Sequence, residues 1–137
     1  MIITRRSAAV TFAAAWLLLL LVAVPGAKAA PDTLPGRYAV QGIGADGATT
    51  YGGEAVVEAT GETYKVTWLL PGGQVYVGTG IRQGESFAVT YLNARAEGAS
   101  APGIVLYTVR PDGSLTGIYS QLGSATISAE AWNPKGT

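Results

Sequence analysis

The sequence contains no cysteine and no histidine among its 137 residues. Without cysteine the protein can have no disulfide, no thiol nucleophile and no thiolate ligand for a metal. Without histidine it lacks the usual general base near neutral pH and the commonest ligand of transition metals. Triad catalysis and Cys/His metal centres are therefore excluded, and we expect no catalytic residue, no metal and no cofactor.

Charged residues are also scarce, at 13% of the chain. The formal net charge of zero includes Arg5, Arg6 and Lys28 of the N-terminal segment. Without those three, the nine basic residues fall to six against nine acidic ones, which is a net charge of −3. A mildly acidic domain lacks the basic surface that binds DNA, RNA or anionic lipid. We expect no nucleic-acid partner.

The N-terminal segment has the three parts of a secretion signal. Arg5 and Arg6 supply its positive start, and residues 7–24 form an apolar stretch. Pro25-Gly26 breaks the helix ahead of Ala27-Lys28-Ala29, a cleavage site with small residues at both ends. A retained membrane anchor is the alternative, because the apolar run approaches the roughly 20 residues that span a bilayer. The cleavage site favours removal of the segment. Whether export uses the general secretion pathway or the twin-arginine pathway stays open.

We therefore expect residues 1–29 to be a cleaved signal peptide and residues 30–137 to be a single mature domain. The mature protein is expected in the periplasm or outside the cell, with no stable membrane insertion after cleavage.

The mature sequence alternates short β-branched or aromatic runs with turns rich in Gly, Pro and Asp, which is typical of a β-meander, sandwich or barrel. Eight strands are predicted: 37–42, the two strands of a hairpin over 51–70, 74–81, 86–92, 104–109, 114–119 and 124–131. Short links place each strand antiparallel beside its predecessor, and closing the sheet removes its unpaired edges. The expected fold is an all-β, eight-stranded antiparallel up-and-down barrel, with a two-sheet β-sandwich as the alternative.

The hairpin over 51–70 carries the most specific register prediction. A two-residue turn at Thr60-Gly61 would place Lys65 diagonally between Glu54 and Glu58 on the outer face. On the inner face the same turn gives the pairs Val57–Tyr64, Ala55–Val66, Gly53–Trp68 and Tyr51–Leu70. The two glutamates lie about 13 Å apart along one strand, whereas glycosidases need roughly 5 to 9.5 Å between their carboxyl groups.

In the last predicted strand, alternation divides the residues between two faces. The inward set is Ala125, Ile127 and Ala129, and the outward set is Ser124, Thr126, Ser128 and Glu130. Outward polar and charged residues argue against a barrel that spans a membrane.

The aromatic residues of the mature chain are mostly predicted to point inward. In an eight-stranded barrel such residues either fill the interior or line a cavity for one small ligand. Both outcomes are open from the sequence. The candidate ligand-binding residues are Tyr64, Trp68, Tyr91, Tyr107 and Tyr119.

Several motifs occur in one order along the mature chain: residues 36–42 (GRYAVQG), Asp46-Gly47, residues 51–53 (YGG), residues 61–68 (GETYKVTW) and residues 112–119 (DGSLTGIY). This pattern resembles a family of small exported alphaproteobacterial proteins that are commonly labelled fibronectin-binding protein. The resemblance implies a periplasmic or secreted bacterial protein, and the label implies adhesion.

A second, local resemblance covers residues 117–124 (GIYSQLGS). This segment is similar to the first hairpin of the avidin and streptavidin family, whose eight-stranded barrels bind biotin. The resemblance would place Ser120 and Ser124 at ureido-binding positions, while Ile118 stands where that family has tryptophan.

The function expected is that of a non-enzymatic, exported binding or surface-interaction module, including adhesion to a host or matrix protein. The alternative is a small-molecule carrier that holds its ligand inside the barrel. The expected partner is accordingly an unidentified protein or a small apolar or polar ligand.

Overall fold

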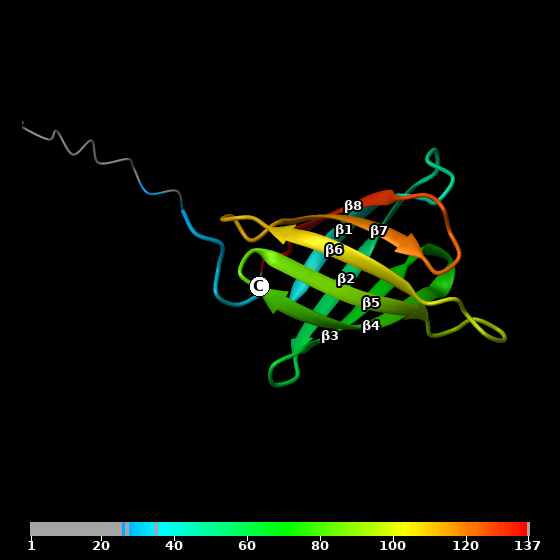
Figure 1. The fold of residues 1–137 in the computed structure, drawn as a ribbon, viewed down its shortest axis with the longest axis horizontal. Coiled ribbons are helices and arrows are strands. Elements are labelled where there is room, and N and C mark those ends of the chain that lie inside the picture. Colours follow the sequence, from blue (N-terminus) through cyan, green and yellow to red (C-terminus); the bar gives the residue numbers. More distant parts are fainter. Residues whose placement is uncertain (1–25, 27, 35, 137) are drawn as a thin grey trace, which may run out of the picture.

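The computed structural model describes residues 26, 28–34 and 36–136. Within them, eight strands form one closed antiparallel barrel in which each strand pairs with the next and the last returns to the first (Figure 1). The strands are β1 (Arg37–Ile43), β2 (Thr50–Ala59), β3 (Tyr64–Leu70), β4 (Gln74–Gln83), β5 (Ser86–Asn93), β6 (Gly103–Val109), β7 (Leu115–Gln121) and β8 (Ser128–Pro134). A single 3-10 turn, η1 (Pro71–Gly73), joins β3 to β4. The predicted up-and-down barrel is confirmed, and the sandwich alternative is wrong.

The predicted signal peptide, 1–29, lies outside the described residues except for Gly26, Lys28 and Ala29. In the part of the chain that the structure describes, no helix is both long enough and apolar enough to cross a membrane.

The barrel interior forms the hydrophobic core, because alternate residues of every strand point into it. On β6, for example, Val105, Tyr107 and Val109 are each at most 2% exposed, while Ile104 and Leu106 are 56% and 50% exposed. The bulkiest fully buried side chains are Trp132, Tyr38, Tyr107, Phe87 and Leu115. A strand that is apolar on both faces in the sequence therefore has one buried and one open face.

The hairpin of β2 and β3 has the predicted faces but not the predicted register. Val57 lies opposite Val66, and Ala55 opposite Trp68, so every pair is displaced by two residues. The cause is a longer loop, in which the Thr60 amide donates to the Thr63 carbonyl at 2.8 Å. A displacement of two residues leaves each side chain on its own face of the sheet.

The outer-face charges follow this register. Glu58 lies directly opposite Lys65, with 3.6 Å between Oε2 and Nζ, rather than diagonally from it. Glu54 pairs instead with Arg37 on β1, at 2.5 Å, and with Lys135 beyond β8, at 2.6 Å.

The faces predicted for the last strand are wrong. β8 begins at Ser128 rather than at residue 124, and Ser128, Glu130 and Trp132 point into the barrel. The prediction ended this strand at Ala131, one residue before Trp132, which is fully buried. Burying an indole removes more apolar area from water than burying small alanine side chains does. Trp132 therefore sets the face, and Glu130 comes inside with it.

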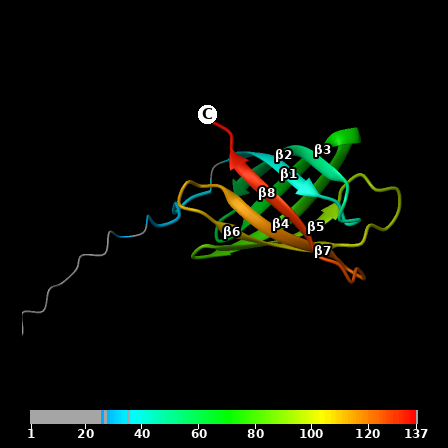
Figure 2. The same cartoon turned by 90° about the horizontal axis from the view of Figure 1, so that it is seen from above.

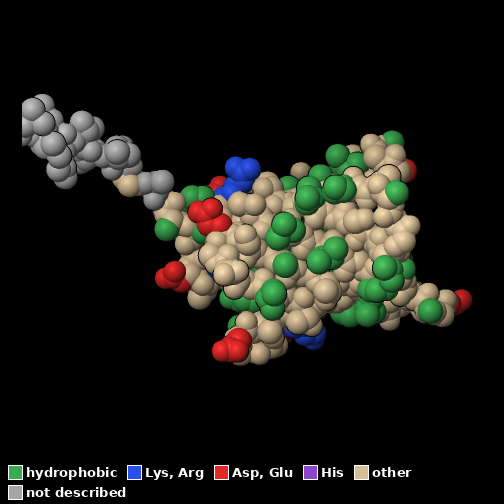
Figure 3. Space-filling view, viewed as in Figure 1, with side chains coloured by type: hydrophobic (Ala, Val, Ile, Leu, Met, Phe, Trp, Pro, Cys, Tyr) green, Lys and Arg blue, Asp and Glu red, His purple; other side chains and the backbone are tan. Residues whose placement is uncertain are grey.

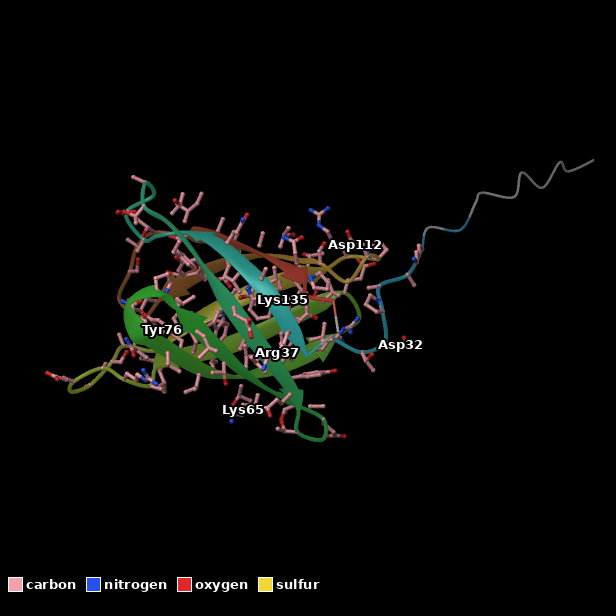
Figure 4. The ribbon with its side chains drawn as sticks, turned by 180° about the vertical axis from the view of Figure 1, so that it is seen from behind. Asp32, Arg37, Lys65, Tyr76, Asp112 and Lys135 are labelled. Atoms are coloured by element: carbon pink, nitrogen blue, oxygen red, sulfur yellow. The ribbon has the colours of Figure 1, made fainter. Side chains whose placement is uncertain are left out.

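The outer surface differs between the two sides of the barrel. The outward residues of β4 to β8 include no charged side chain, and Ile81, Leu106 and Ile118 are each at least half exposed there. In Figure 3 the face that carries β5, β6 and β7 accordingly shows hydrophobic side chains, with charged ones only at its margins. Figure 4 shows Arg37, Lys65 and Lys135 on the other side.

The two ends of the barrel are also unlike. At the end where β1 begins and β8 ends (Figure 2), Ala30 and Leu34 of the segment before β1 pack against the core. Arg82 of β4 holds that segment, because its guanidinium donates to the Pro31 carbonyl at 2.6 Å and to the Asp32 carbonyl at 3.3 Å. This end is therefore covered by residues that follow the expected cleavage site.

Candidate functional site

The opposite end of the barrel opens into a cavity of about 510 Å³. Its wall comes from inward side chains near the ends of most strands, and its rim comes from the loops after β1, β3 and β7. The aromatic residues among its lining are Tyr51, Trp68, Tyr76, Tyr91, Tyr107 and Tyr119. The interior is thus neither packed solid nor hollow throughout: the core fills it toward the covered end, and the cavity opens at the other end.

Tyr91 of β5 lies at the centre of the aromatic cluster. Its ring centroid lies 6.0 Å from that of Trp68, 5.9 Å from that of Tyr76 and 6.3 Å from that of Tyr119, all in edge-on arrangements. Such arrangements add attraction beyond the area that they bury. The cluster spans β3, β4, β5 and β7, so its rings hold one another in place around the cavity.

A glycine on the neighbouring strand makes room for the Tyr91 ring. Gly103 of β6 lies opposite Tyr91, and a Cβ atom there would overlap the ring. The same relation holds between Gly117 and the Tyr107 ring. Each ring therefore extends across the glycine on the neighbouring strand, into space that a side chain there would occupy.

A buried carboxylate forms the floor of the cavity. Glu130 of β8 is 8% exposed and has four hydrogen-bond donors. Its Oε1 accepts from the Tyr107 hydroxyl at 2.5 Å, from Trp132 Nε1 at 2.5 Å and from Trp68 Nε1 at 3.2 Å. Its Oε2 accepts from the Tyr51 hydroxyl at 2.5 Å. Since indole nitrogens can only donate, the carboxylate is the acceptor that this set of side chains requires.

The Glu130 charge also affects the tyrosines beside it. Burial and then the negative charge of Glu130 raise the pKa of the Tyr107 and Tyr51 phenols well above the ordinary value of 10.0. Burial, followed by neighbouring tyrosines, raises the pKa of Tyr91 to about 12. These phenols therefore stay protonated near neutral pH and act as donors, not as bases.

Glu130 is the only charged residue among the described residues that line the cavity. Arg95 lies at the rim, where its guanidinium donates to the Gly73 carbonyl at 3.1 Å. Asp46 lies in the loop after β1 and accepts from the Thr49 and Ala48 amides. The rim therefore carries charges of both signs, whereas the interior carries one negative charge.

Four of the five candidate ligand-binding residues meet in this cavity, namely Trp68, Tyr91, Tyr107 and Tyr119. Tyr64 does not, because it is the first residue of β3 and lies at the covered end, where its ring packs edge-on against Phe87 at 5.5 Å. That these residues bind a ligand stays a prediction.

The sequence reasoning did not assign Tyr51, Tyr76 and Glu130 to this site. Tyr76 lies at the open end of β4 (Figure 4). The signal that could have found Glu130 is Trp132, because the two residues share one face of a strand and a tryptophan there marks the inner face. Ser120 and Ser124, the positions singled out by the avidin resemblance, also line the cavity.

No cluster of three or more acidic residues that could hold a metal ion occurs in the portion described by the structure. No family model matches the sequence, and no curated protein matches it either.

Proposed function

We propose that the mature protein binds a small organic molecule in the cavity at the open end of the barrel and performs no chemistry on it. The observation that carries this proposal is a cavity of about 510 Å³ whose wall is an aromatic cluster centred on Tyr91. This volume falls within the roughly 300–1,000 Å³ of typical ligand sites, which are largely apolar with a few polar groups.

Binding without catalysis is supported by the state of the polar groups inside. A general acid or base must be free to exchange a proton with its substrate. An ionised carboxylate offers about two lone-pair sites on each oxygen; three donors crowd Oε1 of Glu130 and the Tyr51 hydroxyl takes one site of Oε2, so at most one site is free. The tyrosines have raised pKa values and are poor bases near neutral pH.

Titration with the neutral dye N-phenyl-1-naphthylamine tests the proposal. The dye should gain fluorescence in the cavity, and Ser128→Phe should abolish that gain because residue 128 points into the cavity opposite Tyr119. Ile127→Phe is the matched control, since Ile127 is 69% exposed in the adjoining loop. Equal dye binding by the two variants, with both folded by circular dichroism, would refute a ligand site inside the barrel.

Export to the periplasm or the cell exterior is part of the same proposal. The evidence is the arrangement of Arg5 and Arg6, the apolar stretch and the cleavage site in the sequence. Cell fractionation followed by N-terminal sequencing tests it, and the expected first residue is Ala30. A product that retains Met1 in the membrane fraction would contradict it.

Adhesion to a host or matrix protein stays a prediction that rests on the family resemblance. The uncharged outer side of β4 to β8 is the surface that would contact such a protein. Immobilised fibronectin should then retain the purified protein at physiological salt, and absence of retention would remove the adhesion hypothesis while leaving the cavity unaffected.

A further inference from the structure

We propose that the cavity selects an organic cation, specifically a fully alkylated ammonium group with a short polar tail. This inference rests on the proposed function, because it names the class of molecule for the same cavity. Three features of the described residues carry it: the sign of the buried charge, the occupied lone pairs of that charge, and the aromatic wall.

The buried charge is negative and has no cationic partner in the interior. The ion pairs among the described residues join Glu54 to Arg37 and Lys135, and Glu58 to Lys65, all on the outer surface. Glu130 is held by neutral hydroxyl and indole donors alone. These donors stabilise the carboxylate but add no positive charge, so its field extends into the cavity, and the surrounding protein screens that field less than bulk water would.

The occupied lone pairs decide which kind of cation fits. A primary ammonium binds a carboxylate through N–H donation and needs free lone pairs on the oxygens. Oε1 of Glu130 already accepts from Tyr107, Trp68 and Trp132, and Oε2 accepts from Tyr51. At most one lone-pair site, on Oε2, is left for the three N–H donors of a primary ammonium, so at least two of them would find no acceptor on this carboxylate. A quaternary ammonium has no N–H to donate, and its methyl groups pack against rings, so it gains from the charge without displacing these bonds.

The aromatic wall supplies the remaining attraction. Cations bind over the faces of tryptophan and tyrosine rings, and cages of several rings recognise quaternary ammonium groups in proteins. Trp68, Tyr76, Tyr91 and Tyr119 surround the space above Glu130. Among the described lining residues there is no lysine or arginine to repel a cation.

The polar side chains at the rim of the cavity are the reason for proposing a ligand with a short polar tail. Between the aromatic wall and solvent, the lining includes the hydroxyl and amide side chains of Thr50, Gln74, Gln121 and Thr126. The side-chain NH₂ group of Gln121 donates to the Ala101 carbonyl at 2.9 Å. This bond does not involve the side-chain oxygen of Gln121, which can therefore accept from a hydroxyl group of the ligand. A ligand with its ammonium near Glu130 and a hydroxyl near the rim would satisfy both regions.

The test compares choline with 3,3-dimethylbutan-1-ol, which has the same shape but carries no charge, by calorimetric titration of the purified protein. Choline should bind at least about tenfold more tightly, and ethanolamine should bind more weakly than choline. Equal affinity for choline and its neutral analogue, or tighter binding of ethanolamine, would overturn the inference.

Variants assign the effect to Glu130. Glu130→Gln keeps a side-chain oxygen for the three donors to Oε1, and the Tyr51 hydroxyl can rotate to accept from the new amide. We expect this variant to lose about tenfold more affinity for choline than for the neutral analogue. Glu58→Gln, the same change on the outer surface, is the matched control and should alter neither affinity. Choline affinity unchanged by Glu130→Gln would overturn the inference.

Tyr76→Leu, at the rim end of the aromatic cluster, is a second variant that does not alter the buried hydrogen bonds. It should weaken choline binding several-fold more than binding of the neutral analogue, because a leucine keeps apolar contact but has no ring face. Equal loss for both would count against a cation. If N-phenyl-1-naphthylamine and the neutral analogue bind but choline does not, the cation inference fails while the proposed function stands; if none of the three binds, both fail.

Discussion

Removal of the Glu130 side chain should be among the most destabilising single changes in this barrel. Glu130→Ala takes one acceptor away from four donors at once. Three of those donors, on Trp68, Tyr107 and Trp132, belong to side chains that are at most 4% exposed. A buried donor without a partner costs about 1–3 kcal/mol, so the three together would cost about 3–9 kcal/mol.

Two effects reduce this cost. Removing a buried charge returns the free energy that was spent in desolvating it. The enlarged cavity also admits water, which can accept from some of the donors. We therefore expect a loss near the lower limit, about 3–4 kcal/mol of unfolding free energy, out of the roughly 5–15 kcal/mol of a typical domain.

Urea unfolding followed by tryptophan fluorescence measures this loss. Glu130→Gln should cost less, about 1–2 kcal/mol, because its oxygen keeps three donors while charge-assisted bonds become neutral ones. Glu58→Ala, which breaks an exposed ion pair, should cost under about 1 kcal/mol. A Glu130→Ala loss no greater than that of Glu58→Ala would refute the view that Glu130 organises the interior.

Three further predictions concern tyrosines and the glycine that one of them requires. Tyr38 has a buried hydroxyl with no partner among the described residues, so Tyr38→Phe should raise the unfolding free energy by about 1 kcal/mol, as measured by urea unfolding. Tyr107→Phe should lower the unfolding free energy, because it removes a hydrogen bond to Glu130. A change of the same sign in both variants would contradict this prediction. Burial and Glu130 raise the pKa of Tyr107 above its ordinary 10.0. The unfolding free energy should therefore not depend on this group below pH 10, and above pH 10 it should fall by up to about 1.4 kcal/mol per pH unit. The phenolate absorbance of Tyr107 should appear only as the protein unfolds. Gly103→Ala should push the Tyr91 ring into the cavity and weaken dye binding, at a cost of about 1–3 kcal/mol in stability, whereas Gly36→Ala, where an added Cβ has its nearest neighbour at 4.0 Å, should leave dye binding unchanged.

The barrel itself could be predicted from the sequence because its signals are local and repeated. Period-two alternation and short glycine turns recur along the whole mature chain, and each constrains only the strands beside it. An error in one turn does not change the topology. The hairpin of β2 and β3 illustrates this, since a loop two residues longer than predicted moved Val57 from Tyr64 to Val66 and left both faces as expected.

The floor of the cavity could not be predicted in the same way, because it depends on residues from four strands that have no common signal in the sequence. A glutamate in an alternating polar run reads as an outward residue, as Glu58 is, and the difference lies in what surrounds it in space. Glu130 is buried because the fully buried Trp132 fixes the face of β8, and because β2, β3 and β6 each bring one donor, from Tyr51, Trp68 and Tyr107, within hydrogen-bonding distance. Desolvating a carboxylate is unfavourable unless its lone pairs are filled, so these donors and Glu130 depend on one another. A buried acid that arises in this way marks the part of the barrel where core stability and ligand selection rest on the same residue, so exchanging Glu130 for glutamine should lower both the unfolding free energy and the affinity for choline.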